Sequence, residues 1–205
     1  MEKIYREKGI RILKGVKPTS FEQAGERIVI RTDQDSIEVD LIIAGIGIKP
    51  NVGLAESVGL KTNDGILVNS FLQTSRPDIY AAGDNTRFPC PVLGRDVRLE
   101  HWDNAIKQGK QAGRNIAGAS EAYTQLPYFF SDLFKFGYEA VGEIDPRLET
   151  FADWQKENDT GVIYYLRDGK LRGALMCNVW DKAEKAKELI LQGAGPANRL
   201  AGAIR

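Results

Sequence analysis

The stretch "TSRPDIYAAGDNTRFP", Thr74–Pro89, joins a segment of strand character to a Gly-Asp pair. The residues Asp78–Ala82 are compatible with a β-strand, and Gly83 and Asp84 follow them directly. A glycine at a strand end allows close approach of a ligand, and a carboxylate accepts hydrogen bonds from hydroxyl groups. The stretch therefore predicts a ligand contact at the end of a buried strand.

The residues before this stretch carry the pattern of a sheet. Segments 27–32 and 36–39 predict two strands joined by a polar turn, and the segment 10–23 also alternates. The uninterrupted apolar run "LIIAGIGI", Leu41–Ile48, predicts a strand covered on both faces, as in a parallel sheet. The chain is therefore expected to form a small antiparallel sheet, followed by a central strand of a parallel sheet.

Helical spacing, glycines and prolines predict further elements in the first 120 residues. These are helices over 1–9, 52–59 and 102–116, a strand pair over 64–75 and a loop over 88–95. Gly9 and Gly59 are expected to close the two short helices, and Asp103 is placed to cap the long one. Asp64 and Gly65 are expected to form the turn of the strand pair.

The pattern of the sequence changes near residue 122 to an alternation of short strands, and a domain boundary is expected there. The elements expected beyond it are strands over 135–144, 161–169 and 170–180, and a helix over 181–200. Asp168-Gly169 predicts the hairpin turn between the last two strands. Asp181 and Glu184 fit a capping box, and the glycine-rich "GAGPAN", 193–198, is expected to be a helix stop.

Composition narrows the class of protein. The chain has 205 residues, 42% hydrophobic and 27% charged, which suits a soluble globular protein of one large or two small domains. Its formal net charge is zero, which argues against a nucleic-acid partner. The two cysteines, Cys90 and Cys177, lie far apart, so buried free thiols are expected rather than a metal cluster or redox disulfide. Without a visible signal peptide or membrane span, a cytoplasmic location is expected.

Four segments occur in one order at sensible spacing. They are "DLIIAGIGIKPN" (40–51), "TSRPDIYAAGD" (74–84), "EHWDNAIKQGKQAGRNIAG" (100–118) and "PYFFSDLFKFGYEAVGE" (127–143). Together they resemble the C-terminal half of FAD- and NAD(P)H-dependent flavoproteins of the pyridine nucleotide-disulfide oxidoreductase type. The similarity is greatest to the ferredoxin reductases and apoptosis-inducing-factor-like proteins, and it extends from Tyr5 to about Trp180.

The resemblance implies an α/β fold with partial doubly wound nucleotide-binding domains and a C-terminal α+β domain with an antiparallel sheet. The implied domains are 1–50 (end of the NAD(P)-binding domain), 51–122 (end of the FAD-binding domain) and 123–205. Each nucleotide-binding domain of the family carries a GxGxxG turn, where a helix N-terminus binds pyrophosphate. No segment of this sequence fits that turn in a strand–turn–helix context. A complete enzyme of this type would be roughly twice as long.

The resemblance also assigns roles to cofactor-binding residues. Gly83 and Asp84 are expected at the FAD ribityl chain; otherwise Asp84 caps the next segment. The segment Glu100-His101-Trp102 is expected to open a helix whose N-terminus faces the pyrimidine edge of the flavin. Glu100 would lie on the nicotinamide side, and the alternative for Trp102 is core packing. No proton-transfer role is expected for His101, the only histidine.

Five further residues are implied. Ala105 lies on the same helix, and Phe130 stands where related reductases often carry a tryptophan close to the flavin; its alternative is a place in the core. The backbone of Gly45-Ile46-Gly47 is expected to line the nicotinamide-side cleft, and the alternative is tight strand packing. No catalytic or metal-ligating residue is assigned in this chain.

The leading hypothesis is that this chain is part of an NAD(P)H oxidoreductase, which passes electrons through FAD to a redoxin, a quinone or oxygen. Because both GxGxxG turns are missing, the chain alone is expected to be inactive. The alternative is a non-catalytic interaction or oligomerisation module, or one subunit of a split flavoenzyme. The expected partners are a redoxin, an N-terminal half or subunit, or a second copy.

Overall fold

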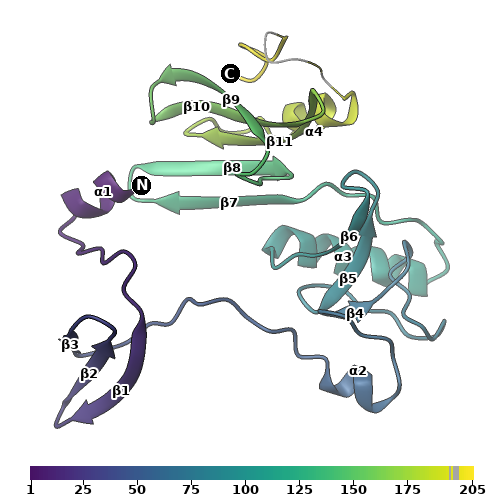
Figure 1. The fold of residues 1–205 in the computed structure, drawn as a ribbon. Helices are drawn as coiled ribbons and strands as arrows, with labels where there is room; N and C mark the ends of the chain where they lie inside the picture. Colours follow the sequence, from purple (N-terminus) through teal and green to yellow (C-terminus); the bar gives the residue numbers. More distant parts are fainter. Residues whose placement is uncertain (194, 196–198) are drawn as a thin grey trace. The chain divides into compact units, whose positions relative to one another are not determined.

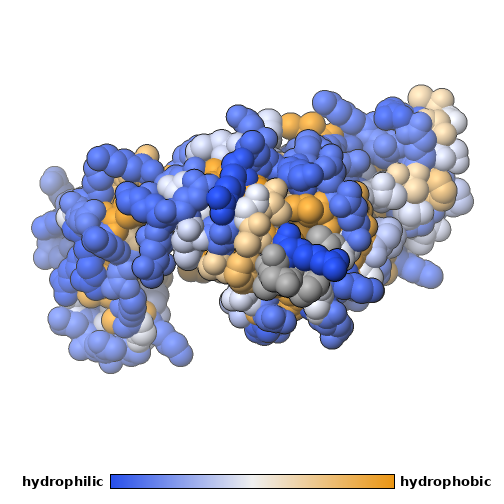
Figure 2. Space-filling view, turned by 90° about the horizontal axis from the view of Figure 1, so that it is seen from above, coloured by the Kyte–Doolittle hydropathy of each residue, from blue (hydrophilic) through white to orange (hydrophobic). Residues whose placement is uncertain are grey.

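A computed structural model describes residues 1–193, 195 and 199–205 (Figure 1). The chain divides into two compact units, Met1–Ile48 and Lys49–Arg205. The three-domain division expected from the sequence stays a prediction. Among the described residues no helix is long and apolar enough to cross a membrane. Most of the face seen in Figure 2 is hydrophilic, with hydrophobic residues showing between the charged ones.

The first unit contains one short helix and one small sheet. Helix α1 spans Glu2–Glu7, and Gly9 follows with a φ of +77°, as its predicted role at the helix end requires. The antiparallel sheet has the order β1-β2-β3, formed by β1 (Pro18–Ala24), β2 (Arg27–Thr32) and β3 (Ser36–Val39). The two strands predicted over 27–32 and 36–39 are confirmed, whereas the alternating segment before them becomes a strand only at Pro18.

The buried strand predicted at Leu41–Ile48 is wrong for this structure. The run has no strand conformation and forms no backbone hydrogen bond with any described residue. Leu41, Ile43 and Ile46 are 74%, 89% and 93% exposed. A strand needs at least one neighbouring strand to pair its backbone groups, and the antiparallel sheet β1-β2-β3 does not extend to this run.

The first part of the second unit is built around two helices and a three-stranded sheet. Helices α2 (Gly53–Ser57) and α3 (Trp102–Ile116) confirm the predicted helices. The sheet order is β4-β5-β6, with β4 (Ile66–Leu67) parallel to β5 (Thr86–Cys90) and β6 (Arg95–Arg98) antiparallel to it. The buried residues of its core are Leu72, Phe88, Cys90, Leu93, Val97, Ala112 and Tyr123.

The loop predicted over 88–95 is a β-hairpin. Strand β5 tolerates Pro89, although proline has no N–H to donate. Strand β4 pairs only with Thr86 and Arg87 of β5, so Pro89 lies beyond the parallel ladder. The strand predicted at Asp78–Ala82 is wrong here, since only an isolated bridge between Gln73 and Tyr80 forms. A strand of a doubly wound sheet needs parallel neighbours, and β4-β5-β6 does not supply them to this segment.

The pair of strands predicted over 64–75 shrinks to β4 and a bridge between Thr62 and Ile66. Its turn is present, because Asp64 and Gly65 have φ values of +47° and +124°. Both cysteines are free and buried, as expected. In the described residues no group of acidic, histidine or cysteine side chains is arranged to hold a metal ion.

The C-terminal part of this unit is a five-stranded antiparallel sheet of order β7-β8-β11-β10-β9. Its strands are β7 (Tyr128–Leu133), β8 (Phe136–Gly142), β9 (Glu149–Lys156), β10 (Thr160–Arg167) and β11 (Lys170–Cys177). Helix α4 (Ala183–Leu191) packs against β8 and β11. The fully buried side chains of this core include Val141, Val162, Tyr164, Leu171 and Met176.

The turn at Asp168-Gly169 is confirmed, with φ values of +52° and +70°, but β9 was not expected from the sequence. The predicted capping residues are wrong. Helix α4 has Lys182 at its N-cap, without a side-chain cap, while Asp181 takes a φ of +60° and Glu184 pairs with Lys187. The helix stop expected at 193–198 falls largely on positions 194 and 196–198, outside the described residues.

Candidate functional site

The start of α3 presents free backbone donors. Its N-cap, His101, is extended at φ −116° and ψ 131°, and no side chain caps the helix. Asp103, predicted as the cap, instead pairs with Lys107 at 2.7 Å within the helix. The first helical backbone bond runs from the N–H of Ala105 to the carbonyl of His101. The N–H groups before it give this helix end a positive electrostatic character that suits an acceptor or an anion.

A pocket of about 300 Å³ lies at this helix start. Its lining residues are Glu100, His101, Trp102, Asp103, Tyr128, Phe129 and Phe130. Trp102 is 73% exposed and Phe130 is 52% exposed, so neither is a core residue. The corner before α3 and strand β7 therefore form two walls of one aromatic pocket, here called the α3 pocket.

Gly83 and Ala105 pack together beside this helix. Gly83 is buried at a φ of +87°, and its N–H donates to Oε1 of the buried Gln108 at 2.8 Å. A Cβ added to Gly83 would lie 3.6 Å from the Cβ of Ala105. A side chain at Gly83 would therefore require backbone strain and fill the space beside α3.

The next residue, Asp84, is exposed. Its carbonyl oxygen accepts from Nη1 of Arg98 at 3.2 Å, and its carboxylate makes no hydrogen bond or ion pair in the described part of the chain. The alternative of a capping carboxylate is thus not what this structure shows. Arg98 also donates to Glu100 at 2.7 Å, so one largely buried guanidinium orients both predicted residues.

The imidazole of His101 is held between the two walls. Its ring lies 4.7 Å from that of Phe129, between centroids. Burial lowers the pKa of His101, and the nearby carboxylates of Asp84, Glu100 and Asp103 oppose this shift. The net lowering favours a neutral imidazole at neutral pH, which supports a packing role rather than a charged one.

Two residues of the site were missed from the sequence. The hydroxyl of Tyr128 donates to Oε1 of Glu139 at 2.6 Å, and burial together with this carboxylate raises the pKa of Tyr128. Lys107 and Lys187 place their ammonium groups 5.9 and 5.8 Å from the Tyr128 ring centroid. A glutamate within the apolar segment "GYEAVG" was the signal, since a buried carboxylate needs a donor.

Gly45, Ile46 and Gly47 belong to the first unit. A Cβ added at either glycine meets nothing within 4 Å, so tight strand packing does not explain them here. Gly47 has a φ of +87°. Their assignment to a nicotinamide cleft stays a prediction, as do the cofactor roles of the residues at the α3 pocket.

Residues 1–109 match the family model described as pyridine nucleotide-disulphide oxidoreductase. This chain belongs to that family. Residues 112–160 match a second model, described as apoptosis-inducing factor, mitochondrion-associated, C-term. These matches confirm the family inferred from the four ordered segments. The family members that this chain resembles are FAD- and NAD(P)H-dependent reductases.

Similar proteins come from bacteria and plants. The ferredoxin–NAD(+) reductase component of the anthranilate 1,2-dioxygenase system of Burkholderia cepacia is 31% identical over 196 residues, which cover 95% of this chain and 48% of that protein. Monodehydroascorbate reductase 3 of Arabidopsis thaliana is 33% identical, over 85% of this chain and 42% of that protein. The chain thus spans about half the length of these relatives.

A solved structure has a similar fold. The covalent complex of putidaredoxin reductase with putidaredoxin contains a chain that matches with a TM-score of 0.86 at 28% identity. The match covers 94% of this chain and 47% of that one. The expected fold of partial nucleotide-binding domains followed by an antiparallel α+β domain is consistent with this match.

Proposed function

We propose that this chain supplies the C-terminal half of the flavin site in an FAD-dependent NAD(P)H oxidoreductase. The observation that carries the proposal is the α3 pocket, where an uncapped helix N-terminus meets aromatic side chains. A bound flavin would supply the chemistry of hydride acceptance from NAD(P)H and onward electron transfer. The donors at the start of α3 suit the electron-rich pyrimidine edge of such a ring.

The residues present fit the flavin end of FAD. Asp84 offers an exposed carboxylate for ribityl hydroxyls, and Gly83 keeps the adjoining backbone free of a side chain. Trp102 and Phe130 offer exposed aromatic faces to the ring. A pocket of about 300 Å³ is at the small end of the range for ligand sites, so the chain fits one end of the cofactor. We infer that the adenosine end is held by the half of the fold that this chain does not span.

A redoxin is the electron acceptor that the structure supports best. Lys107, Lys110 and Arg114 follow one another along α3 and line a pocket of about 210 Å³. Lys107 pairs with Asp103, and Arg114 pairs with Glu121. Lys110 forms no ion pair with the described residues. An acidic redoxin is complementary to such a surface. The relatives named for ferredoxin and putidaredoxin support the same partner class.

A second candidate function is that of a subunit. The exposed apolar run Leu41–Ile48 favours a chain that associates, because unpaired strand-like segments pair with other chains. The partner we propose first is the N-terminal half of this fold, and a second copy of the chain is the alternative. The cytoplasmic location expected from the sequence stays a prediction.

The proposal is tested by complementation. The chain is co-expressed with the half of the Burkholderia cepacia reductase that it does not match, and the purified material is assayed for bound flavin and NADH oxidation. We expect flavin and activity only when both halves are present, and loss of flavin with Asp84→Ala. Stoichiometric flavin and NADH oxidation by this chain alone would show that it is not half of a site.

The matched control is Asp96→Ala, which removes another exposed carboxylate of the same unit away from the α3 pocket. It is expected to leave flavin binding unchanged. Sedimentation of the chain alone separates the two association partners. A flavin-free homodimer that persists when the N-terminal half is also present contradicts the proposal that the N-terminal half is the partner.

A further inference from the structure

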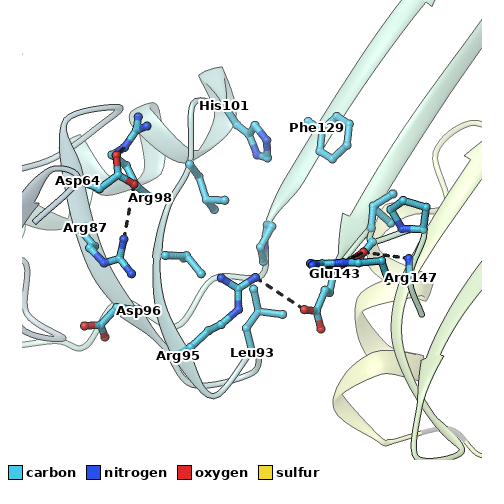
Figure 3. A pocket seen from close by; sticks show the side chains of 17 residues that line it. Asp64, Arg87, Leu93, Arg95, Asp96, Arg98, His101, Phe129, Glu143 and Arg147 are labelled. Carbon is cyan, nitrogen blue, oxygen red and sulfur yellow. Dashed lines mark hydrogen bonds and ion pairs between the residues drawn. The ribbon is translucent and has the colours of Figure 1, made fainter. Parts of the chain in front are cut away.

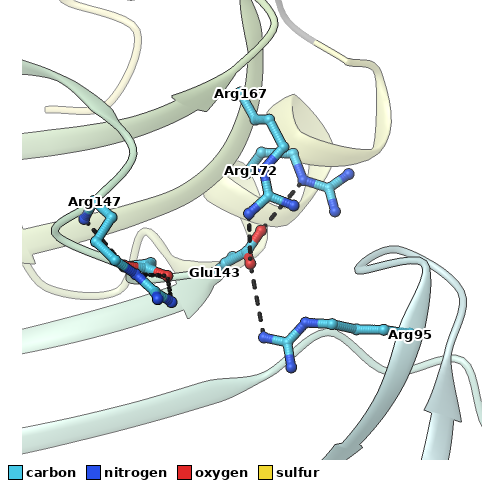
Figure 4. Close-up of polar contacts among 6 residues, drawn as sticks. Arg95, Glu143, Arg147, Arg167 and Arg172 are labelled. Carbon is cyan, nitrogen blue, oxygen red and sulfur yellow. Dashed lines mark hydrogen bonds and ion pairs between the residues drawn. The ribbon is translucent and has the colours of Figure 1, made fainter.

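Glu143 follows β8 directly and is a deeply buried carboxylate, with a side chain 6% exposed. Its Oε1 lies 3.1 Å from Nη2 of Arg167 and 3.7 Å from Nη2 of Arg95 (Figure 4). Its Oε2 lies 3.6 Å from Nε of Arg172. Arg95 begins β6, whereas Arg167 and Arg172 belong to β10 and β11. One carboxylate therefore joins the β5–β6 hairpin to the C-terminal sheet.

The backbone fixes the position of this carboxylate. The N–H of Glu143 donates to the carbonyl of Arg172 at 2.9 Å. A Cβ added at Gly142, whose φ is +80°, would lie 2.2 Å from that carbonyl oxygen. A Cβ at Gly173 would lie 2.3 Å from the carbonyl oxygen of Glu143. Only glycine fits at these two positions, so the ends of β8 and β11 touch and Glu143 has little freedom.

The Arg95–Glu143 ion pair crosses a larger pocket of about 530 Å³ (Figure 3). His101 and Phe129 also line this pocket, and both line the α3 pocket as well. The segment from β6 to the start of α3 is thus joined to the C-terminal sheet at two places. A charged contact between Arg95 and Glu143 joins them at one place, and the ring contact between His101 and Phe129 joins them at another.

We propose that Glu143 is a positioning residue: through Arg95 it holds the β5–β6 hairpin against the C-terminal sheet and so keeps His101 against Phe129 at the α3 pocket. Without its carboxylate, Arg95, Arg167 and Arg172 retain three positive charges around a position that no longer carries a negative one. The hairpin bearing Arg95 then moves away from the sheet. The value of this contact to flavin binding rests on the proposed function, but the contact itself needs no cofactor.

The experiment uses the single histidine as a reporter. His101 gives the only histidine imidazole signals in the proton NMR spectrum, and its ring-current shift reports the Phe129 ring. In Glu143→Gln we expect the ring-current shift to fall. We also expect the pKa of His101 to rise as water reaches the ring. The groups around the imidazole are Asp84, Glu100, Asp103 and Arg98, and all four are unchanged in this variant.

The sign of the change in the pKa of His101 distinguishes a positioning role of Glu143 from a direct electrostatic effect of its charge. Loss of a negative charge by itself lowers the pKa of a nearby histidine, whereas opening the contact raises it. An unchanged ring-current shift, or a lowered pKa with that shift unchanged, overturns the proposal. The readout is independent of flavin, so it stands apart from failure of the complementation experiment.

Two arginine variants complete the test. Arg95→Gln removes the other partner at a side chain that is 59% exposed, and it should reduce the ring-current shift as Glu143→Gln does. It keeps the proposal falsifiable if Glu143→Gln does not fold. Arg147→Gln is the matched control, because Arg147 lines the same pocket but pairs with Asp145. An equal change in Arg147→Gln and Arg95→Gln would contradict the proposal.

Discussion

The C-terminal sheet and the run Leu41–Ile48 are both apolar in sequence, yet only one of them is folded. Strands β10 and β11 pair along their whole length and bury Tyr164 and Met176 completely. The run Leu41–Ile48 pairs with no described residue, and Ile43, Ile46 and Ile48 face solvent. The difference shows that an apolar pattern becomes a strand only when the chain also supplies the neighbouring strands.

The largest expected difference between these regions is in amide hydrogen exchange. Amides of β10 and β11 should be protected by about a thousand-fold or more, because they open only with much of the sheet. Amides of Leu41–Ile48 should exchange almost as in an unfolded peptide. Mass spectrometry of the exchanged, pepsin-digested chain measures both regions. Equal protection of the two regions would mean that the run is paired in solution.

A matched pair of leucine substitutions extends the comparison to stability. Leu171→Ala removes a side chain that is 1% exposed and should lower the free energy of unfolding by about 2–5 kcal/mol. Leu41→Ala removes one that is 74% exposed and should change it by less than about 0.5 kcal/mol. Urea unfolding followed by tryptophan fluorescence measures both, and a comparable loss in the two variants contradicts the comparison.

Glycines give a smaller version of the same contrast. Gly173→Ala brings a Cβ to 2.3 Å from the carbonyl oxygen of Glu143 and should cost about 1–3 kcal/mol. Gly45→Ala meets nothing within 4 Å and should be nearly neutral. The same unfolding assay applies. If Gly173→Ala is also neutral, the close approach of β8 and β11 is not rigid.

The smallest effect concerns pH. Because burial lowers the pKa of His101, the folded chain binds fewer protons than the unfolded chain at mildly acidic pH. The contribution of His101 to stability is therefore present above its unfolded pKa and is lost as the pH falls through that value to the folded pKa. The stability of the wild type minus that of His101→Gln should fall between about pH 7.5 and pH 5. A difference that is independent of pH would mean that the imidazole is solvated.

Local patterns predicted most of the fold correctly. Strands 27–32 and 36–39, helix α3 and the turn at Asp168-Gly169 depend on neighbours within a few residues, and all are present. The strands predicted at Leu41–Ile48 and Asp78–Ala82 failed because their partners are distant in any parallel sheet. The β5–β6 hairpin was missed because a proline was taken as a loop signal, although an incompletely paired strand tolerates it.

The candidate site was predicted in part. Ten cofactor-binding residues were chosen from family motifs, and the structure brings four of them, Glu100, His101, Trp102 and Phe130, to one pocket. The segment "GYEAVG" signals that Glu139 needs a donor, but the sequence does not identify Tyr128 as that donor. It also does not predict the cluster around Glu143, because each contact joins strands whose register is set by the folded sheet. The N-caps of α3 and α4 were also predicted wrongly, since an acidic residue near a helix start is compatible with several positions besides the N-cap.

The exposed run Leu41–Ile48 has a consequence for the life of the chain in a cell. It offers eight consecutive residues without a charge to proteases, chaperones and other unfolded chains. A copy whose run remains unpaired is removed or aggregates, and a copy whose run is covered persists. We therefore expect the amount of intact protein to depend on the supply of whatever pairs with this run.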